Sequence, residues 1–270
     1  MNTKTRILAQ VLAGGDKPET ADIIYAQKIA GGGGGGVTIV PWSTGTDEEI
    51  AAMIAAAHAG KINLQTDGGW AVGDVRSITV GAFTAGGNVS VPEQTIDIVI
   101  SQFGDYMNCG CVMQFDFKDA LTNGVRINSA LTNSGGWGQS EMKSTTIPAL
   151  VNALPDWLKN SLIEFSCLAS AGAGSDTIET ITGNKLALRS EVEIFGYKAY
   201  SKAGEGSQIA YYETSANRKK KRGHSGSDSG WWTRSPYASG SRQFCNISSS
   251  GSVSYNDANA PQGVAPFGCL

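Results

Sequence analysis

The chain has 270 residues, of which 41% are hydrophobic, and a formal net charge of −3 at pH 7. This length is enough for one large domain or two small ones around a hydrophobic core. The small net charge gives no reason to expect nucleic acid or an acidic membrane as the main partner. The 35 glycines favour many turns and a loop-rich fold that contains strands.

The first 36 residues predict an attachment segment followed by a linker. Residues 1–30 contain no apolar stretch long enough for a signal peptide or a membrane-spanning helix, so we expect neither secretion by the general route nor membrane insertion. They fit a short helical or mixed segment. Residues 31–36 are six consecutive glycines, which are typical of a flexible tether and less often of a tightly packed backbone crossing. We take the main domain as residues 37–270.

A helix is predicted directly after Thr46, because Glu49 stands three residues later in the spacing of a capping box. Apolar residues at 50, 53, 54 and 57 recur at helical spacing, and Gly60 follows as a stop signal. Alternating or β-branched runs predict strands over Val75–Phe83, Thr95–Ile100 and Val112–Phe117. The remaining two segments are a helix over Ile147–Leu162, interrupted or restarted at Pro155, and an extended or mixed stretch over Lys185–Phe195.

The last forty residues, 231–270, predict a polar display region held between two anchor blocks. Trp231–Pro236 and Gly263–Phe267 carry the aromatic and proline anchors, and small polar residues fill the stretch between them. A turn at Ser250-Gly251 joins two alternating runs into a hairpin. Alternation sends one set of side chains inward (Cys245, Ile247, Val253, Tyr255) and the other to solvent (Asn246, Ser248, Ser252, Ser254, Asn256).

No catalytic or metal-binding constellation is visible in the sequence. His58 and His224 stand outside any nucleophile or metal motif. Cys109-x-Cys111 lacks the two-residue gap and the partner pair of a zinc site. We therefore expect no enzyme, no metal and no cofactor.

Several conspicuous residues have an ordinary structural interpretation. The five cysteines are an odd number in a large chain, which favours buried or unreactive thiols over a disulfide framework. Asp67 and Asp74, each beside glycine, could offer carboxylates for acid–base chemistry or for calcium, but we favour turns in which the side chain bonds to nearby backbone amides. The basic run 218–222, RKKKR, fits either an anion-binding cluster or, as we favour, a solvated loop. Trp231 and Trp232 fit core anchors at least as well as a stacking site for sugars.

Three blocks in order, KLALRSEVEIFG (185–196), WWTRSP (231–236) and GVAPF (263–267), resemble a C-type-lectin-like domain family that is widespread in bacteriophages and in bacteria of Gram-positive and gut lineages. With WAVGD (70–74), the resemblance covers roughly residues 42–270. It implies an α+β mixed fold with short helices, a small antiparallel sheet and long loops. The Glu-Pro-Asn and Trp-Asn-Asp motifs of calcium-dependent sugar binding are absent, so that activity is not expected.

Within that family, the C-terminal layout is similar to the variable proteins of diversity-generating retroelements. In those proteins a lectin-type scaffold holds a ligand-facing surface whose codons are rewritten. The resemblance places ligand-binding positions at nine residues: Ser241, Arg242, Gln243, Asn246, Ser250, Ser252, Asn256, Asp257 and Gln262.

The resemblance implies a phage virion surface protein of the tail-tip or fibre type, assembled in the bacterial cytoplasm. It would bind a host-surface receptor, protein or glycan, non-covalently, and contact other virion proteins through its N-terminal segment. A homo-oligomer, by analogy a homotrimer, is expected. The alternatives are a purely structural virion component, such as capsid decoration or a baseplate part, and a cysteine-dependent oxidase in which Cys245 and Cys269 would act.

Overall fold

The computed structural model describes residues 37–270, so the predicted attachment segment, 1–30, and glycine linker, 31–36, lie outside the described residues. The chain divides into two compact units, Met1–Ala71 and Val72–Leu270. The predicted domain over 37–270 spans both units, and its boundaries stay a prediction. Among residues 37–270, no helix has both the length and the apolar character needed to cross a membrane.

The described part of the first unit is built around helix α3 (Asp47–His58), as predicted. Thr46 caps it: its hydroxyl oxygen accepts from the backbone N–H of Glu49 at 3.2 Å, and the Thr46 N–H donates to the Glu49 carboxylate at 2.9 Å. This reciprocal pair satisfies two backbone donors that a helix start otherwise leaves unpaired. Ile50, Met53 and Ile54 of the predicted apolar stripe are buried.

Two tryptophans complete the core of this unit. The rings of Trp42 and Trp70 meet edge to face with centroids 5.1 Å apart, and the Trp70 indole N–H donates to the Val40 carbonyl at 2.9 Å. The Asp67 carboxylate accepts from the Asn63 N–H at 2.8 Å. Asp67 therefore bonds nearby backbone in a turn, as predicted.

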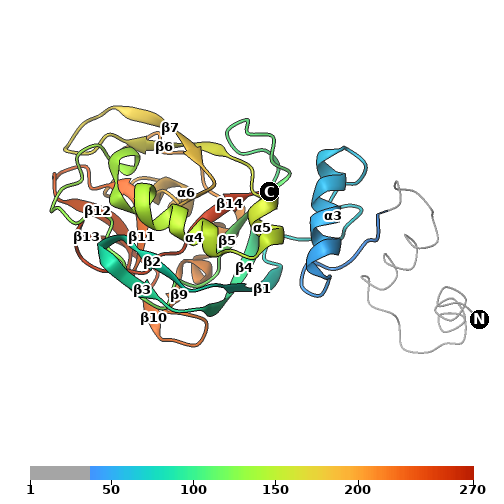
Figure 1. The fold of residues 1–270 in the computed structure, drawn as a ribbon. Coiled ribbons are helices and arrows are strands. Elements are labelled where there is room, and N and C mark those ends of the chain that lie inside the picture. The colour runs from blue at the N-terminus through green and yellow to red at the C-terminus, as the bar shows by residue number, and fades with distance from the viewer. Residues whose placement is uncertain (1–36) are drawn as a thin grey trace, which may run out of the picture. The chain divides into compact units, whose positions relative to one another are not determined.

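The second unit is a mixed α+β structure with few short helices and several small antiparallel sheets (Figure 1). The widest sheet has the strand order β1-β4-β5-β14-β8, and a second sheet has the order β11-β12-β13. Pairs β2–β3, β6–β7 and β9–β10 complete the sheets of the described residues. The elements are β1 (Val75–Val80), β2 (Phe83–Ala85), β3 (Val89–Val91), β4 (Gln94–Phe103), β5 (Met113–Phe117), α4 (Ile147–Ala153), α5 (Asp156–Ser161), β6 (Phe165–Ser170), β7 (Ile178–Asn184), β8 (Leu186–Ala187), α6 (Glu191–Phe195), β9 (Lys220–Lys221), β10 (Asp228–Ser229), β11 (Trp231–Pro236), β12 (Gln243–Ile247), β13 (Val253–Asp257) and β14 (Phe267–Cys269).

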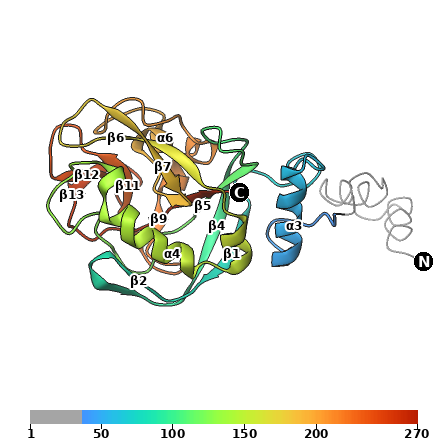
Figure 2. The same ribbon diagram turned by 45° about the horizontal axis from the view of Figure 1, so that its top comes forward.

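Figures 1 and 2 show the β11-β12-β13 sheet at one end of this unit and β1 at the opposite end. The order of the strands in the widest sheet differs from their order along the chain. Strand β14, near the C-terminus, pairs with β5 on one side and with β8 on the other. This pairing places the anchor block 263–267 beside the middle of the widest sheet.

The predicted elements are largely confirmed, but the strand predicted over Val75–Phe83 ends at Val80, and strands β6 and β7 and helix α6 were not predicted. The predicted helix over 147–162 is interrupted at Pro155, which separates α4 from α5. Leu154, the residue before that proline, is extended at ψ 152°, as sterics with the proline ring require. The mixed stretch 185–195 contains α6, which has a capping box between Ser190 and Glu193 and ends at Gly196 with φ 77°.

Two buried arginines organise the interior of the second unit. Arg189 forms an ion pair with Asp116, with a shortest N···O distance of 2.7 Å, and both side chains are fully buried. The same guanidinium donates to Gln114 at 2.9 Å and to Ser101 at 3.0 Å. The Tyr212 hydroxyl donates to Asp116 at 2.8 Å. Every charge removed from water here has a partner, which is the condition for keeping charges in a core.

Arg234 forms the second buried ion pair, with Glu193 of α6. Its two terminal nitrogens lie 2.6 and 2.9 Å from the two carboxylate oxygens, the bidentate geometry that arginine favours. The guanidinium also donates to the carbonyls of Leu168, Leu188 and Glu205. Arg234 thereby links β6, β11 and α6 at one point.

Candidate functional site

The C-terminal hairpin forms as predicted. Strands β12 and β13 pair in the register Gln243↔Asp257, Cys245↔Tyr255 and Ile247↔Val253. Gly251 closes the turn at φ 83°, a conformation that suits glycine. The hairpin is the outer part of the β11-β12-β13 sheet, so β12 is its central strand and β13 its edge strand.

The predicted inward and outward sets are wrong at two positions. Asn246, predicted to face solvent, is only 5% exposed, because β12 is central and both of its faces are covered. Tyr255, predicted to point inward, is 43% exposed, because β13 is the edge strand, where the core ends. Cys245 and Ile247 are buried as predicted, and Ser252 is exposed as predicted. The other predicted outward residues (Ser248, Ser254, Asn256) and inward Val253 are half-buried.

The nine predicted ligand-binding residues do not form one cluster. Four are exposed (Ser241, Arg242, Ser250, Ser252), four are half-buried (Gln243, Asn256, Asp257, Gln262) and Asn246 is buried. Ser250 and Ser252 lie at the hairpin turn, whereas residues 241–243 and 256–257 lie at its open end. Asn246 and Gln262 both lie beside Gly230: a Cβ atom at that position would lie 3.5 Å from the side-chain amide of Asn246 and 2.6 Å from that of Gln262.

Three tyrosines gather where the structure leaves the open end of the hairpin exposed. The rings of Tyr237 and Tyr255 stack with centroids 4.2 Å apart and an interplanar angle of 10°. Tyr200 meets Tyr255 edge-on at 5.1 Å. Tyr200 and Tyr255 are 37% and 43% exposed, and Tyr237 is half-buried. We call these three residues the tyrosine face.

Sequence reasoning missed the tyrosine face because its members come from three separate segments. The buried carboxylate of Glu191 positions Tyr200: it accepts from the N–H groups of Ala199, Tyr200 and Ser201 at 2.5–3.1 Å. The Tyr200 carbonyl in turn accepts from the Ala238 N–H at 2.8 Å. These bonds tie the loop after α6 to the loop after β11, and so bring Tyr200 beside Tyr237.

Predicted polar residues border the tyrosine face. The Gln243 side-chain amide donates to Asp257 at 2.8 Å, and a guanidinium nitrogen of Arg242 lies 3.6 Å from the other Asp257 oxygen. The loop that carries Arg242 is held from below by Asn133, whose side chain is buried and donates to the carbonyls of Gly240 and Gln243 at 2.9 and 2.7 Å. The border is therefore pre-organised on a fixed loop.

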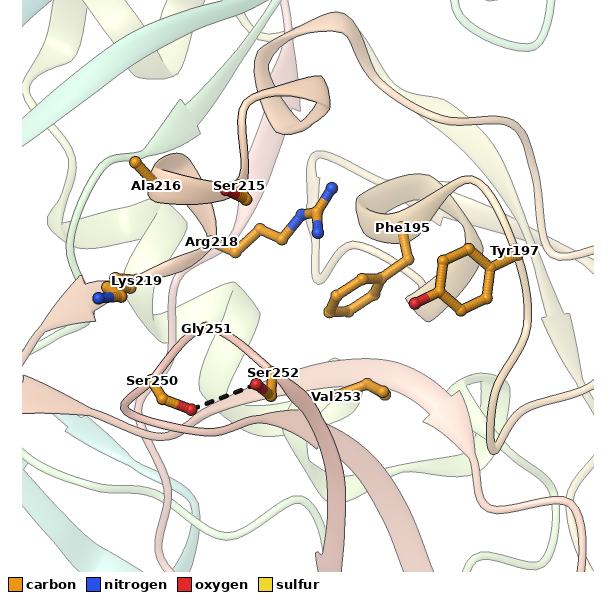
Figure 3. A pocket seen from close by; sticks show the side chains of 10 residues that line it. All are labelled: Phe195, Tyr197, Ser215, Ala216, Arg218, Lys219, Ser250, Gly251, Ser252 and Val253. Atoms are coloured by element: carbon orange, nitrogen blue, oxygen red, sulfur yellow. Dashed lines mark hydrogen bonds between the residues drawn. The ribbon is translucent and has the colours of Figure 1, made fainter.

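A hollow of about 470 Å³ lies at the turn of the hairpin (Figure 3). Ser250 and Ser252 of the predicted set line it, together with Arg218, Phe195 and Tyr197. The Arg218 guanidinium points toward Phe195, with Cζ 4.7 Å from the ring centroid. It also donates to the Tyr212 carbonyl at 3.0 Å, so its position is fixed from two sides.

Strand β13 connects the hollow to the tyrosine face. Val253 lines the hollow, Tyr255 belongs to the tyrosine face and Asp257 lies on its polar border. Residues two apart in a strand point to the same side, so these three form one row about 13 Å long. The two surfaces are neighbours on one side of the hairpin.

The prediction of a solvated loop over residues 218–222 is wrong at Lys220, whereas Lys219 and Lys221 are exposed as predicted. Lys220 is fully buried, and its ammonium donates to the carbonyls of Phe117 and Lys118 at 2.5 and 3.2 Å. Burial lowers the pKa of Lys220 to about 8. The Lys220 nitrogen also lies 4.9 Å from the centroid of the Trp231 ring, where a cation is attracted to the aromatic face. Lys220 is therefore part of the scaffold.

The sequence blocks behind the lectin resemblance are also scaffold. Trp231 and Trp232 are fully buried, and their indole N–H groups donate to the carbonyls of Arg218 and Val125 at 2.9 and 2.8 Å. Arg189, Glu193 and Arg234 form the buried ion pairs described above. The prediction that the tryptophans anchor the core is confirmed.

Three of the five cysteines could hold a metal ion. The sulfur atoms of Cys109, Cys111 and Cys269 all lie within 4.8 Å of one another. A hydrogen bond from Cys269 is the largest effect on Cys109 and lowers its pKa to about 6, whereas burial raises the pKa of the Cys269 thiol. The prediction of no metal site rested on the spacing of Cys109 and Cys111 alone. Nothing in the sequence indicates that Cys269 lies beside them.

The other two thiols are isolated from this cluster in their contacts. Cys167 and Cys245 are buried, as predicted, and burial raises the pKa of each. The Cys245 sulfur lies 3.8 Å from the Glu191 carboxylate. Cys245 and Cys269, the pair considered for an oxidase, therefore have different partners.

A family model described as a domain of unknown function, DUF6273, matches residues 113–270, which is more than half of the chain. The chain belongs to the DUF6273 family. Its DUF6273 domain begins at β5 and includes the tyrosine face, the hollow and Cys269, whereas Cys109 and Cys111 precede it. No curated protein and no solved structure matches the chain.

Proposed function

We propose that this DUF6273 protein is a phage virion surface protein, at a tail tip or fibre, that binds a host-surface receptor non-covalently through the tyrosine face. The observation that carries the proposal is the Tyr237–Tyr255 stack, of which Tyr255 is exposed, with the exposed Tyr200 edge-on beside it. Tyrosines supply a large contact area at a low cost in conformational entropy, and for that reason they dominate adaptable recognition surfaces.

The polar border supports recognition in place of a simple apolar contact. Arg242 is 56% exposed and offers guanidinium donors beside the rings, while Asp257 and Gln243 offer acceptors. Aromatic centres surrounded by polar groups are typical of binding sites whose energy is concentrated in a few residues.

The scaffold under this surface supports binding without a large ordering cost. Glu191 fixes the loop of Tyr200, and Asn133 fixes the loop of Arg242. Loops that are already held in place lose less freedom on binding, which raises affinity for a given set of contacts. Repetition of the protein on a particle would raise the overall avidity further.

The proposed fold is C-type-lectin-like, and the proposed relatives are the variable proteins of diversity-generating retroelements. Short helices, small antiparallel sheets and the placement of both anchor blocks in the interior support this view. By the same analogy the protein is a homotrimer whose N-terminal segment contacts other virion proteins, assembled in the bacterial cytoplasm.

A cell-binding screen tests the proposal. Fluorescently labelled full-length protein is incubated with a panel of Gram-positive and gut bacteria and with a glycan array, in wild-type form and as Tyr255→Ser. We expect wild type to bind at least one member of the panel, and Tyr255→Ser to lose most of that binding. Equal binding by both proteins would contradict the proposal; absence of wild-type binding would favour the structural virion role.

A further inference from the structure

The loop after β4 and the end of β14 bring together three cysteines that the proposed receptor site does not use. Cys109 is half-buried, and Cys111 and Cys269 are 3% and 0% exposed. Their sulfurs lie within 4.8 Å of one another. Cys269 comes from the other end of the domain, so only the fold creates this group.

Several contacts hold the loop in the shape that turns both of its thiols the same way. The Tyr106 N–H donates to the Cys111 sulfur at 3.3 Å, and the Gly110 N–H donates to the Asp105 carboxylate at 2.8 Å. Gly110 has φ 84°, which lets the chain reverse between the two cysteines. The third ligand position is equally fixed, because the carbonyl of Leu270, next to Cys269, accepts from Val112 at 2.7 Å.

We propose that Cys109, Cys111 and Cys269 bind a Zn²⁺ ion through three thiolates, with a fourth position open to water. Thiolate sulfurs are the soft ligands that zinc takes in proteins. Tetrahedral zinc with bonds of about 2.3 Å places its sulfur ligands roughly 3.8 Å apart. Sulfurs already within 4.8 Å need to move by no more than about 1 Å to reach that geometry.

The different exposure of the three cysteines would let a metal ion enter the site from one side. Cys111 and Cys269 are closed off from solvent, whereas the half-buried Cys109 lies on the open side. The ion would bind there with release of the thiol protons, since only the thiolates coordinate. Once bound, it would fasten the end of β14 to the loop after β4.

Metal content and cobalt spectroscopy test this site. Full-length protein is produced with added zinc, purified under reducing conditions and analysed for zinc by elemental mass spectrometry. We expect an equimolar amount of zinc in wild type and in Cys167→Ser, a buried thiol outside the cluster, and a loss of zinc in Cys109→Ser. Because Cys109 is the least buried of the three, its serine variant should keep the fold, which circular dichroism checks.

Cobalt provides the second measurement on the unaltered chain. Replacing zinc by Co²⁺ should produce sulfur-to-cobalt charge-transfer absorption and the intense visible bands of a tetrahedral site, and chelation should lower the melting temperature of wild type. Zinc-free wild type without cobalt–thiolate absorption would overturn the proposal, as would zinc retained in folded Cys109→Ser. A disulfide between two of the three cysteines, found by mass spectrometry in protein isolated under reducing conditions, would also overturn it.

Discussion

Replacing Arg234 by methionine tests the claim that the WWTRSP block is internal scaffold. The change keeps the apolar stem of the side chain and removes the guanidinium from its place between α6, β6 and β11. Glu193 then remains buried as a carboxylate with its main cationic partner gone. Burial alone raises the pKa of Glu193, but Arg234 holds that pKa below its ordinary value. Removing Arg234 therefore leaves the buried Glu193 carboxylate without the charge that stabilises it.

The expected loss follows from the contacts. Breaking a buried ion pair by removing one partner costs about 3–5 kcal/mol. Arg234 also satisfies three carbonyls, of Leu168, Leu188 and Glu205, and a buried carbonyl without a donor adds roughly 1–3 kcal/mol. We therefore expect Arg234→Met to lower the free energy of unfolding by about 5 kcal/mol, the upper end of the ion-pair range. Domains are stable by only about 5–15 kcal/mol, so the variant is close to unfolding.

Urea unfolding, followed by tryptophan fluorescence, measures this loss. Arg242→Met is the matched control, because Arg242 is 56% exposed and lies 3.6 Å from Asp257, a pair worth about 0–1 kcal/mol. The double variant Arg234→Met/Glu193→Gln should regain about 2 kcal/mol over the single one, since it leaves no buried charge. A single variant within about 1 kcal/mol of wild type, below the buried-pair range, would refute the reasoning.

Two further predictions concern the buried polar residues Glu205 and Asn133. Burial raises the pKa of Glu205 to about 7 from 4.5, so its stabilising effect is complete below about pH 4.5 and is lost as the pH rises through 7, by about 3 kcal/mol. Glu205→Gln should remove that pH dependence from urea midpoints measured at about pH 5 and pH 8; an unchanged slope would contradict it. Asn133→Ala removes the donors to Gly240 and Gln243, and should cost about 2–3 kcal/mol and speed amide hydrogen exchange in residues 237–243, whereas unchanged exchange would show that the loop is held otherwise.

The sequence was sufficient to predict the elements that are determined by residues close together in the chain. The helix after Thr46 was predicted because its capping box and apolar spacing lie within a few residues. The interruption at Pro155 follows from one proline ring. The hairpin was predicted because alternation and a Ser-Gly turn specify it without reference to the rest of the chain.

The exposure of individual side chains and the make-up of the tyrosine face depend on which segments of the chain lie together. A single sequence does not show which segments do so. Asn246 and Tyr255 alternate correctly, yet the central position of β12 and the edge position of β13 reverse their exposure. Lys220 is buried where the carbonyls of Phe117, at the end of β5, and of Lys118 accept from its ammonium. Tyr200 joins the tyrosine face through Glu191, and no local pattern marks that pairing.

The proposed receptor binding through the tyrosine face is tested most directly by measuring how fast whole phage particles adsorb to host cells. Particles that carry Tyr255→Ser are compared with wild type and with Tyr197→Ser, which makes the same change at a tyrosine that is 57% exposed and lines the hollow instead. We predict normal particle yields, a large fall in adsorption rate for Tyr255→Ser, and wild-type adsorption for Tyr197→Ser. Unchanged adsorption by Tyr255→Ser particles, or a loss confined to Tyr197→Ser, would contradict the account.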